Sequence, residues 1–127
     1  MSVHRIRLHG PWLIRPHLPD VPPGRMTIPA TLHDGGFADY AGRVSLHRHF
    51  GRPTNLDAHE QVWLVFEELI SLEAILLNGK QLSKPNTPIE FDITGDLQDR
   101  NEVEVVLNAT NDRCGILGNV QLEIRSE

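Results

Sequence analysis

Apolar and polar residues alternate along most of this chain with the two-residue period of β-strands, and helical periodicity is nearly absent. Nine prolines and ten glycines divide the chain into short segments, which is typical of an all-β domain. About eight strands separated by turns predict a two-sheet antiparallel β-sandwich. The predicted strands are Val3–His9, Trp12–Arg15, Met26–Ile28, Gly42–Phe50, Gln61–Glu67, a hairpin over Glu73–Leu82, Ile89–Ile93, Asn101–Leu107 and Val120–Ile124.

The connections between these strands have recognisable turn residues. Asn78-Gly79 supplies the two positive φ angles that a type I′ hairpin turn requires. Residues 31–41 and 83–88 are predicted to be loops, and the only helical element expected is a single turn near Leu97. The sequence contains no internal repeat and no linker, so residues 1–127 are predicted to form one domain.

Two of the predicted central strands are apolar on both sides. Trp63 and Val65 lie opposite Leu64 and Phe66, and the hairpin arm Ala74–Leu77 has the same property. A strand that is apolar on two sides needs cover on both. Cover by the N-terminal segment and association with another chain both satisfy this need. In the second case Trp63 and Val65 are the predicted interface residues, either in a homo-oligomer or with a partner protein.

The charge of the chain is unevenly distributed. The formal net charge is −5, and this disfavours nucleic acid as a partner because phosphate neutralisation needs a clustered basic surface. Residues 1–53 carry seven arginines and three aspartates, whereas residues 54–127 carry five basic and fourteen acidic side chains. Pairing between the two parts within one chain explains this asymmetry. A head-to-tail contact between copies explains it as well.

The cysteine content and the apolar runs of the sequence bear on the redox chemistry and the cellular location of the protein. Cys114 is the only cysteine, which excludes a disulfide within the chain. No base lies next to it in the sequence to activate its thiol as a nucleophile. The first ten residues have no apolar run of signal-peptide length, and no run approaches the length of a membrane span. We therefore expect a soluble cytoplasmic protein without a membrane partner.

His47 and His49 are the sharpest candidates for chemistry. They alternate with Arg48 in one predicted strand, so their imidazoles point the same way, about 7 Å apart. Such a pair can contribute to a metal site, but neither an HExxH motif nor a second histidine pair accompanies it, and no metal or cofactor is assigned. If Trp63 lies nearby, the three side chains instead form a sugar platform, in which an aromatic ring lies beside hydrogen-bonding groups. Trp63, His47 and His49 are therefore the predicted ligand-binding residues.

Adjacent carboxylates such as Glu102 and Glu104 are expected to coat a solvent face. General acid–base chemistry needs two carboxyl groups that face each other across a cleft. No catalytic residue is assigned from the sequence.

An ordered set of short segments resembles the N-terminal sugar-binding domain of family 2 glycoside hydrolases, the β-galactosidase and β-glucuronidase group. The matching features are Arg48-x-Phe50, Leu64-x-Phe66, Leu77-Asn78-Gly79, Phe91-Asp92-Ile93-Thr94 with Leu97 and Asn101 following, and Gly115-Ile116 before Val120-x-Leu122. The set spans roughly residues 12–125. SKPNTP at 83–88 and Glu67-Glu68 after Phe66 depart from the family pattern.

The resemblance implies a jelly-roll sandwich of the galactose-binding-domain-like type. It also implies that the catalytic carboxylates of the family lie on a separate barrel domain, which these residues do not resemble. The sequence thus predicts a non-catalytic carbohydrate-binding-like module and no enzyme. The alternatives are a protein-interaction or oligomerisation module without a sugar ligand, and a histidine-based metal site.

Overall fold

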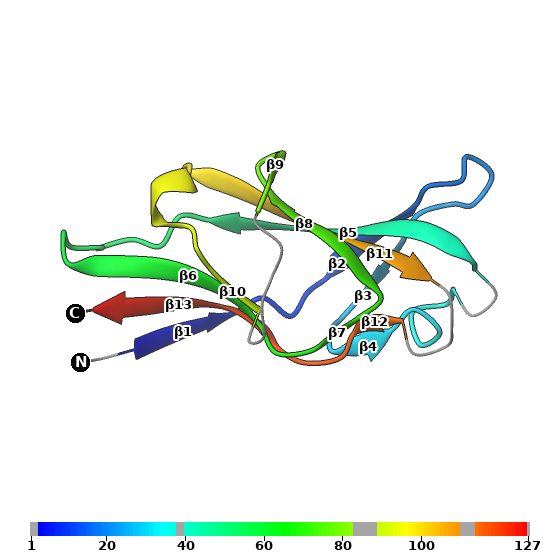
Figure 1. The fold of residues 1–127 in the computed structure, drawn as a ribbon, viewed down its shortest axis with the longest axis horizontal. Helices are drawn as coiled ribbons and strands as arrows, with labels where there is room; N and C mark the ends of the chain where they lie inside the picture. The colour runs from blue at the N-terminus through cyan, green and yellow to red at the C-terminus, as the bar shows by residue number, and fades with distance from the viewer. Residues whose placement is uncertain (1–2, 38–39, 83–88, 110–113, 127) are drawn as a thin grey trace.

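The computed structural model describes residues 3–37, 40–82, 89–109 and 114–126, and these form a β-sandwich (Figure 1). The predicted loop at 83–88 lies outside the described residues. The strands are β1 (Val3–Arg7), β2 (Trp12–Pro16), β3 (Gly24–Met26), β4 (Ala30–Thr31), β5 (Gly42–Gly51), β6 (Glu60–Phe66), β7 (Leu69–Ile70), β8 (Leu72–Leu77), β9 (Lys80–Gln81), β10 (Ile89–Asp92), β11 (Arg100–Ala109), β12 (Gly115–Ile116) and β13 (Val120–Ser126). A 3₁₀ turn, η1 (Thr94–Asp96), lies just before Leu97, where one helical turn was expected.

The strands form a four-stranded sheet of order β1-β13-β6-β10 and a six-stranded sheet of order β3-β2-β5-β11-β8-β9. Every pairing among the described strands is antiparallel, which confirms the predicted sandwich. The jelly-roll subtype stays a prediction. A small third sheet, β4-β12-β7, was not expected, because strands of two residues are too short to show an alternating pattern.

The core lies between the two larger sheets and is built from alternate residues of their strands. Val62, Leu64 and Phe66 of β6 are at most 1% exposed, and so are Val103 and Val105 of β11. Each such side chain contributes about 1.5–3 kcal/mol by its removal from water. The alternation places the intervening residues of each strand on the outer faces of the sandwich.

The bend after β10 is held by two side chains of the Phe91-Asp92-Ile93-Thr94 segment. Asp92 Oδ1 accepts hydrogen bonds from the Thr94 amide at 3.0 Å and from its hydroxyl at 2.7 Å, and Thr94 Oγ1 accepts one from the Val62 amide at 2.9 Å. The hairpin turn is also as predicted, since φ is +54° at Asn78 and +83° at Gly79. These local features bring the Asn78 turn and the start of β11 to the same end of the six-stranded sheet.

Candidate functional site

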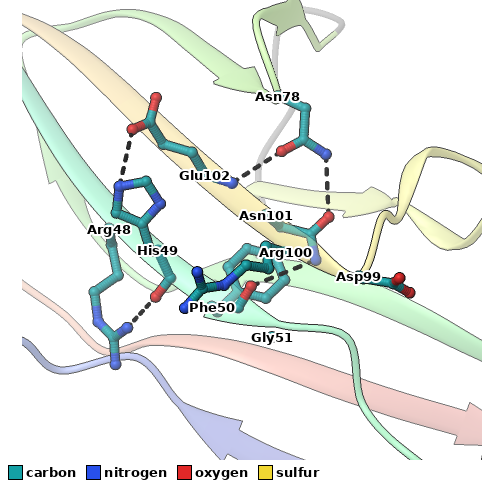
Figure 2. A pocket seen from close by; sticks show the side chains of 9 residues that line it. All are labelled: Arg48, His49, Phe50, Gly51, Asn78, Asp99, Arg100, Asn101 and Glu102. Atoms are coloured by element: carbon teal, nitrogen blue, oxygen red, sulfur yellow. Dashed lines mark hydrogen bonds and ion pairs between the residues drawn. The ribbon is translucent and has the colours of Figure 1, made fainter.

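A pocket of about 800 Å³ lies at this end of the six-stranded sheet (Figure 2). It is formed where β5 ends and β11 begins, beside the turn that joins β8 to β9. Its lining combines two arginines, a histidine and two acids with the ring of Phe50, and this mixture of polar and apolar groups suits a small polar ligand. The lining residues are Arg48, His49, Phe50, Gly51, Asn78, Asp99, Arg100, Asn101 and Glu102.

One wall of the pocket is fixed by two asparagines. Asn78 Oδ1 accepts a hydrogen bond from the Glu102 amide at 2.9 Å, and Asn78 Nδ2 donates to Asn101 Oδ1 at 3.0 Å. Asn101 is 1% exposed and also bonds both backbone groups of Gln98. The polar groups of this wall therefore serve the fold.

Arg48 brings to the pocket a buried donor that has no partner among the described residues. It lies on the side of β5 that carries Val44, Leu46 and Phe50, and in Figure 2 its side chain extends away from the His49 imidazole. One terminal nitrogen, Nη1, donates to the His49 carbonyl oxygen. The buried Nε has no hydrogen-bond partner among the described residues. An unpaired buried donor costs about 1–3 kcal/mol, so an acceptor that reaches it gains correspondingly.

The opposite side of β5 presents its histidines to the acids of β11. The register pairs His49 with Glu102 and His47 with Glu104. The imidazole-to-carboxylate distances are 3.2 Å for His49–Glu102, 3.5 Å for His47–Glu102 and 3.9 Å for His47–Glu104. Within the described part of the chain, no group of three or more His, Cys, Asp or Glu side chains has the arrangement of a metal site.

The structure does not bring Trp63 together with His47 and His49. Trp63 lies on β6 of the four-stranded sheet, whereas both histidines lie on β5 of the six-stranded sheet. Each of the three side chains points outward from its own sheet, so the whole sandwich separates them. The joint sugar platform expected from the sequence is therefore not formed.

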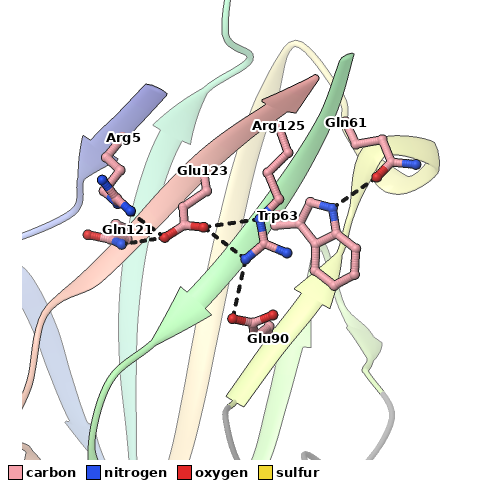
Figure 3. A network of polar contacts seen from close by, with 7 residues as sticks. All are labelled: Arg5, Gln61, Trp63, Glu90, Gln121, Glu123 and Arg125. Carbon is pink, nitrogen blue, oxygen red and sulfur yellow. Dashed lines mark hydrogen bonds and ion pairs between the residues drawn. The ribbon is translucent and has the colours of Figure 1, made fainter. Parts of the chain in front are cut away.

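Trp63 belongs instead to a polar network on the outer face of the four-stranded sheet (Figure 3). The Arg125 guanidinium carbon lies 4.5 Å from the centroid of the Trp63 ring. The Trp63 indole nitrogen donates a hydrogen bond to Gln61 Oε1 at 3.2 Å. Arg125 also pairs with Glu90 at 3.2 Å and with Glu123 at 2.8 Å. One face of the indole is thus occupied by a cation.

Glu123 is the centre of this network although it points away from the core. It is 8% exposed, and it accepts hydrogen bonds from Gln121 at 2.7 Å, from Arg125 at 2.8 Å and from Arg5 at 3.3 Å. Burial acts to raise the pKa of Glu123. The hydrogen bonds and the positive charge of Arg125 outweigh this effect and lower the pKa below its ordinary value.

Val65, the other predicted interface residue, is only 7% exposed. In the register it lies between Gln121 of β13 and Glu90 of β10. The N-terminal segment does not cover this face, because β1 extends the four-stranded sheet beside β13 and Trp12 of β2 is buried in the core. Neighbouring polar side chains cover Val65 in place of the N-terminal segment.

Sequence reasoning missed Arg48 and Arg100 as residues of a pocket. A signal for Arg48 was present, because it is the one charged residue among the apolar positions of its side of β5. The convergence of Arg100 and Asp99 with this strand end depends on the pairing of β5 with β11 and has no local signal.

The fold is similar to part of several solved glycosidases. The chain superposes on a β-D-glucuronidase of Dictyoglomus thermophilum with a TM-score of 0.82 and 16% identity, covering 99% of this chain and 28% of that one. For the Bifidobacterium dentium β-glucuronidase complexed with coumarin-3-O-glucuronide, the TM-score is 0.77 and the identity 19%, with coverage of 98% and 30%. For a putative β-galactosidase of Bacteroides fragilis, the values are 0.77 and 17%, with 99% and 24%.

These comparisons establish the fold. At this level of identity they carry no residue roles to the chain, which spans about a quarter to a third of the length of the three enzymes. No family model and no curated protein sequence matches the chain. None of the described residues forms a helix long and apolar enough to cross a membrane.

Proposed function

We propose that this chain is a non-catalytic carbohydrate-binding module whose ligand site is the pocket at the end of the six-stranded sheet. The observation that carries the proposal is that Arg48, whose buried Nε has no hydrogen-bond partner among the described residues, lines the same pocket at the end of β5 as His49 and Glu102 on the other side of the sheet. A sugar presents hydroxyl groups that both donate and accept, and these match a set of arginine, imidazole and carboxylate groups. The ring of Phe50 offers an apolar surface beside them.

The likeness to glycosidases supports a carbohydrate ligand over other small polar molecules. The similar structures are described as β-glucuronidases and a β-galactosidase. The non-catalytic role is supported by the share of those enzymes that the chain matches, since about 70% or more of each has no counterpart in these residues. Galactosides and glucuronides are accordingly the first ligands to test.

Binding is tested by titration calorimetry with methyl β-galactoside, methyl β-glucuronide and a panel of other glycosides. We expect saturable binding of at least one, and about a tenfold loss of affinity in Arg48→Met, which keeps the length of the side chain but removes its donors. Arg48→Lys is expected to weaken binding as well, because lysine keeps the charge but has no Nε donor. The Arg7→Met variant is the matched control, since Arg7 is exposed on β1 of the other sheet.

Three outcomes would contradict the proposal. The absence of saturable heat with every glycoside removes the sugar ligand. Hydrolysis of nitrophenyl glycosides by the purified chain, sensitive to Glu102→Gln or Asp99→Asn, removes the non-catalytic role. Equal binding by the wild type and Arg48→Met would move the sugar site away from this pocket.

A further inference from the structure

The outer face of the six-stranded sheet carries apolar side chains that do not belong to the core. One row across this face runs from Leu13 of β2 through His47 and Glu104 to Leu76 of β8, as the register shows. Their neighbours along the strands, such as Ile14, Leu46 and Ile75, are buried in the core. Members of the row therefore point outward, and Leu13 and Leu76 are half-buried without packing against the core cluster.

The next row of the face adds two more apolar side chains, those of Val106 and Ala74. Val106 pairs with Ser45 on one side and with Ala74 on the other. Val106 and Ala74 are half-buried, and Ser45 is covered by a hydrogen bond to the His17 imidazole at 2.6 Å. The two rows thus place the apolar side chains of Leu13, Leu76, Val106 and Ala74 on this face, around His47, Glu104 and Ser45. A sheet face that meets only solvent is normally polar.

The charges on this face are separated from side to side. The strands β3, β2 and β5 come from the basic first part of the chain, and β11, β8 and β9 come from its acidic second part. On the outer face the first group presents Arg15 and Arg25 at exposed positions, and the second presents Glu102 and Glu104. The boundary between the two halves runs between the central strands β5 and β11.

We propose that this face docks on the same face of a second copy of the chain, across a two-fold axis that runs between β5 and β11 and parallel to them. Such an axis exchanges the left and right sides of the sheet and leaves positions along the strands unchanged. The Leu13 side chain then meets Leu76 of the second copy, and His47 meets Glu104 of the second copy. Every contact occurs twice, as an isologous interface requires.

The charge pattern selects this axis over the other two-fold axis that lies in the plane of the face. An axis perpendicular to the strands would set β2 over β2 and β11 over β11, so that Arg15 would approach Arg15 and Glu104 would approach Glu104. Like charges brought together in this way oppose association. The parallel axis sets the basic half of each copy on the acidic half of the other.

The size of the face predicts a weak dimer. Four strands at their usual spacing and two rows of side chains give on the order of a few hundred Å² per copy, less than the roughly 800 Å² of a standard stable interface. We therefore expect monomer and dimer to exchange with concentration. The test of this association does not depend on the proposed sugar site, because the mass of the protein is measured without any sugar.

The first test is the mass in solution by sedimentation equilibrium, from about 5 μM to about 500 μM. We expect the mass to rise toward twice that of one chain. The Leu76→Gln variant is expected to lose at least tenfold in association constant, because it removes both copies of the Leu13–Leu76 contact. Leu18→Gln is the matched control, since Leu18 is 50% exposed and lies outside the sheet. Thermal melting of both variants verifies that they are folded.

The second test determines the axis by cross-linking. A Leu13→Cys variant and a Leu76→Cys variant are mixed and treated with a short bismaleimide that spans about 10 Å, the usual separation of packed sheets. The parallel axis predicts cross-linked dimers in the mixture and far fewer in either variant alone. The native Cys114 is buried and does not compete.

The proposal is overturned by a monomeric mass at every concentration, or by a dimer that Leu76→Gln leaves intact. Cross-links that form equally well in each variant alone would overturn the parallel axis.

Discussion

The guanidinium of Arg125 lies over the indole ring of Trp63 while it pairs with the largely buried carboxylate of Glu123. The outer side of β6, which the sequence predicts to be apolar, therefore belongs to a polar network. A cation above an aromatic face contributes about 0.5–2 kcal/mol, and a charge-assisted hydrogen bond contributes about 1.5–3 kcal/mol. The network therefore stabilises the four-stranded sheet from outside the core.

Acid should destabilise the protein partly through Glu123. The pKa of this carboxyl is lower in the folded chain than its ordinary value of 4.5, so the unfolded chain binds the proton more tightly. The stabilisation by ionised Glu123 is complete above the unfolded-state value and is lost as the pH falls through the lower folded-state value. Urea unfolding at a series of pH values measures this dependence. We expect Glu123→Gln to lower the free energy of unfolding at pH 7 by about 1–3 kcal/mol and to flatten its acid limb, whereas Glu67→Gln, at an exposed site, should change neither.

Replacement of Asn78 should weaken the hairpin more than its backbone angle alone explains. Its amide joins Glu102, Asn101 and the Asp96 carbonyl, and its φ is positive. Asn78→Ala is expected to cost about 2–4 kcal/mol from the lost hydrogen bonds together with the left-handed conformation. Asn55→Ala isolates the second effect, because Asn55 has φ +61° and is exposed. Similar losses of unfolding free energy in the two variants would contradict a clamping role for the Asn78 side chain.

The small third sheet should tolerate no side chain at Gly115. A Cβ there would lie 2.5 Å from the Ala30 carbonyl oxygen and 2.7 Å from the Thr31 Cα, so β12 could not pair with β4 as it does. We expect Gly115→Ala to lower the free energy of unfolding by about 1–3 kcal/mol. Gly95→Ala, where nothing lies within 4 Å of the added Cβ, should leave it nearly unchanged. Thermal denaturation of the two variants provides the comparison.

Cys114 should be inert in the folded protein. Burial raises the pKa of its thiol, and a hydrogen bond with Ser71 only partly offsets this, so little thiolate is available at neutral pH. Labelling by a disulfide reagent should be slow in buffer and at least a hundredfold faster in denaturant, where the thiol has its ordinary reactivity. Fast labelling of the native protein, at the rate seen in denaturant, would show that the segment around Cys114 opens readily.

The elements of this fold could be predicted because β-strand alternation is a local property. The buried side of β6 is identified by Val62, Leu64 and Phe66 without reference to any other strand. The turn between β8 and β9 is identified by Asn78-Gly79, because these two residues permit positive φ angles. The bend at Asp92 and Thr94 is local only in part. Two of its hydrogen bonds join residues two apart, whereas the bond from the Val62 amide to Thr94 joins residues 32 apart.

The candidate site was less predictable. His47 and His49 share a side of β5 as the period requires, but the partners that they meet, Glu102 and Glu104, come from more than fifty residues later. Trp63 was grouped with them because all three point outward from predicted strands. The sequence predicts that a side chain points outward but does not predict from which sheet. Trp63 lies on the four-stranded sheet, whereas the histidines lie on the six-stranded sheet.

The sequence by itself determined most strands of the two larger sheets, their buried sides, the hairpin and the uneven charge of the two parts of the chain, because each of these depends on neighbours along the backbone. Only the tertiary structure decided which strands lie side by side. That order separates Trp63 from the histidines, leaves Arg48 at a pocket, and sets the basic strands beside the acidic ones in a single sheet. The physical reason is that strand order follows from burying all the apolar sides at once, a condition on the whole chain that no single segment records.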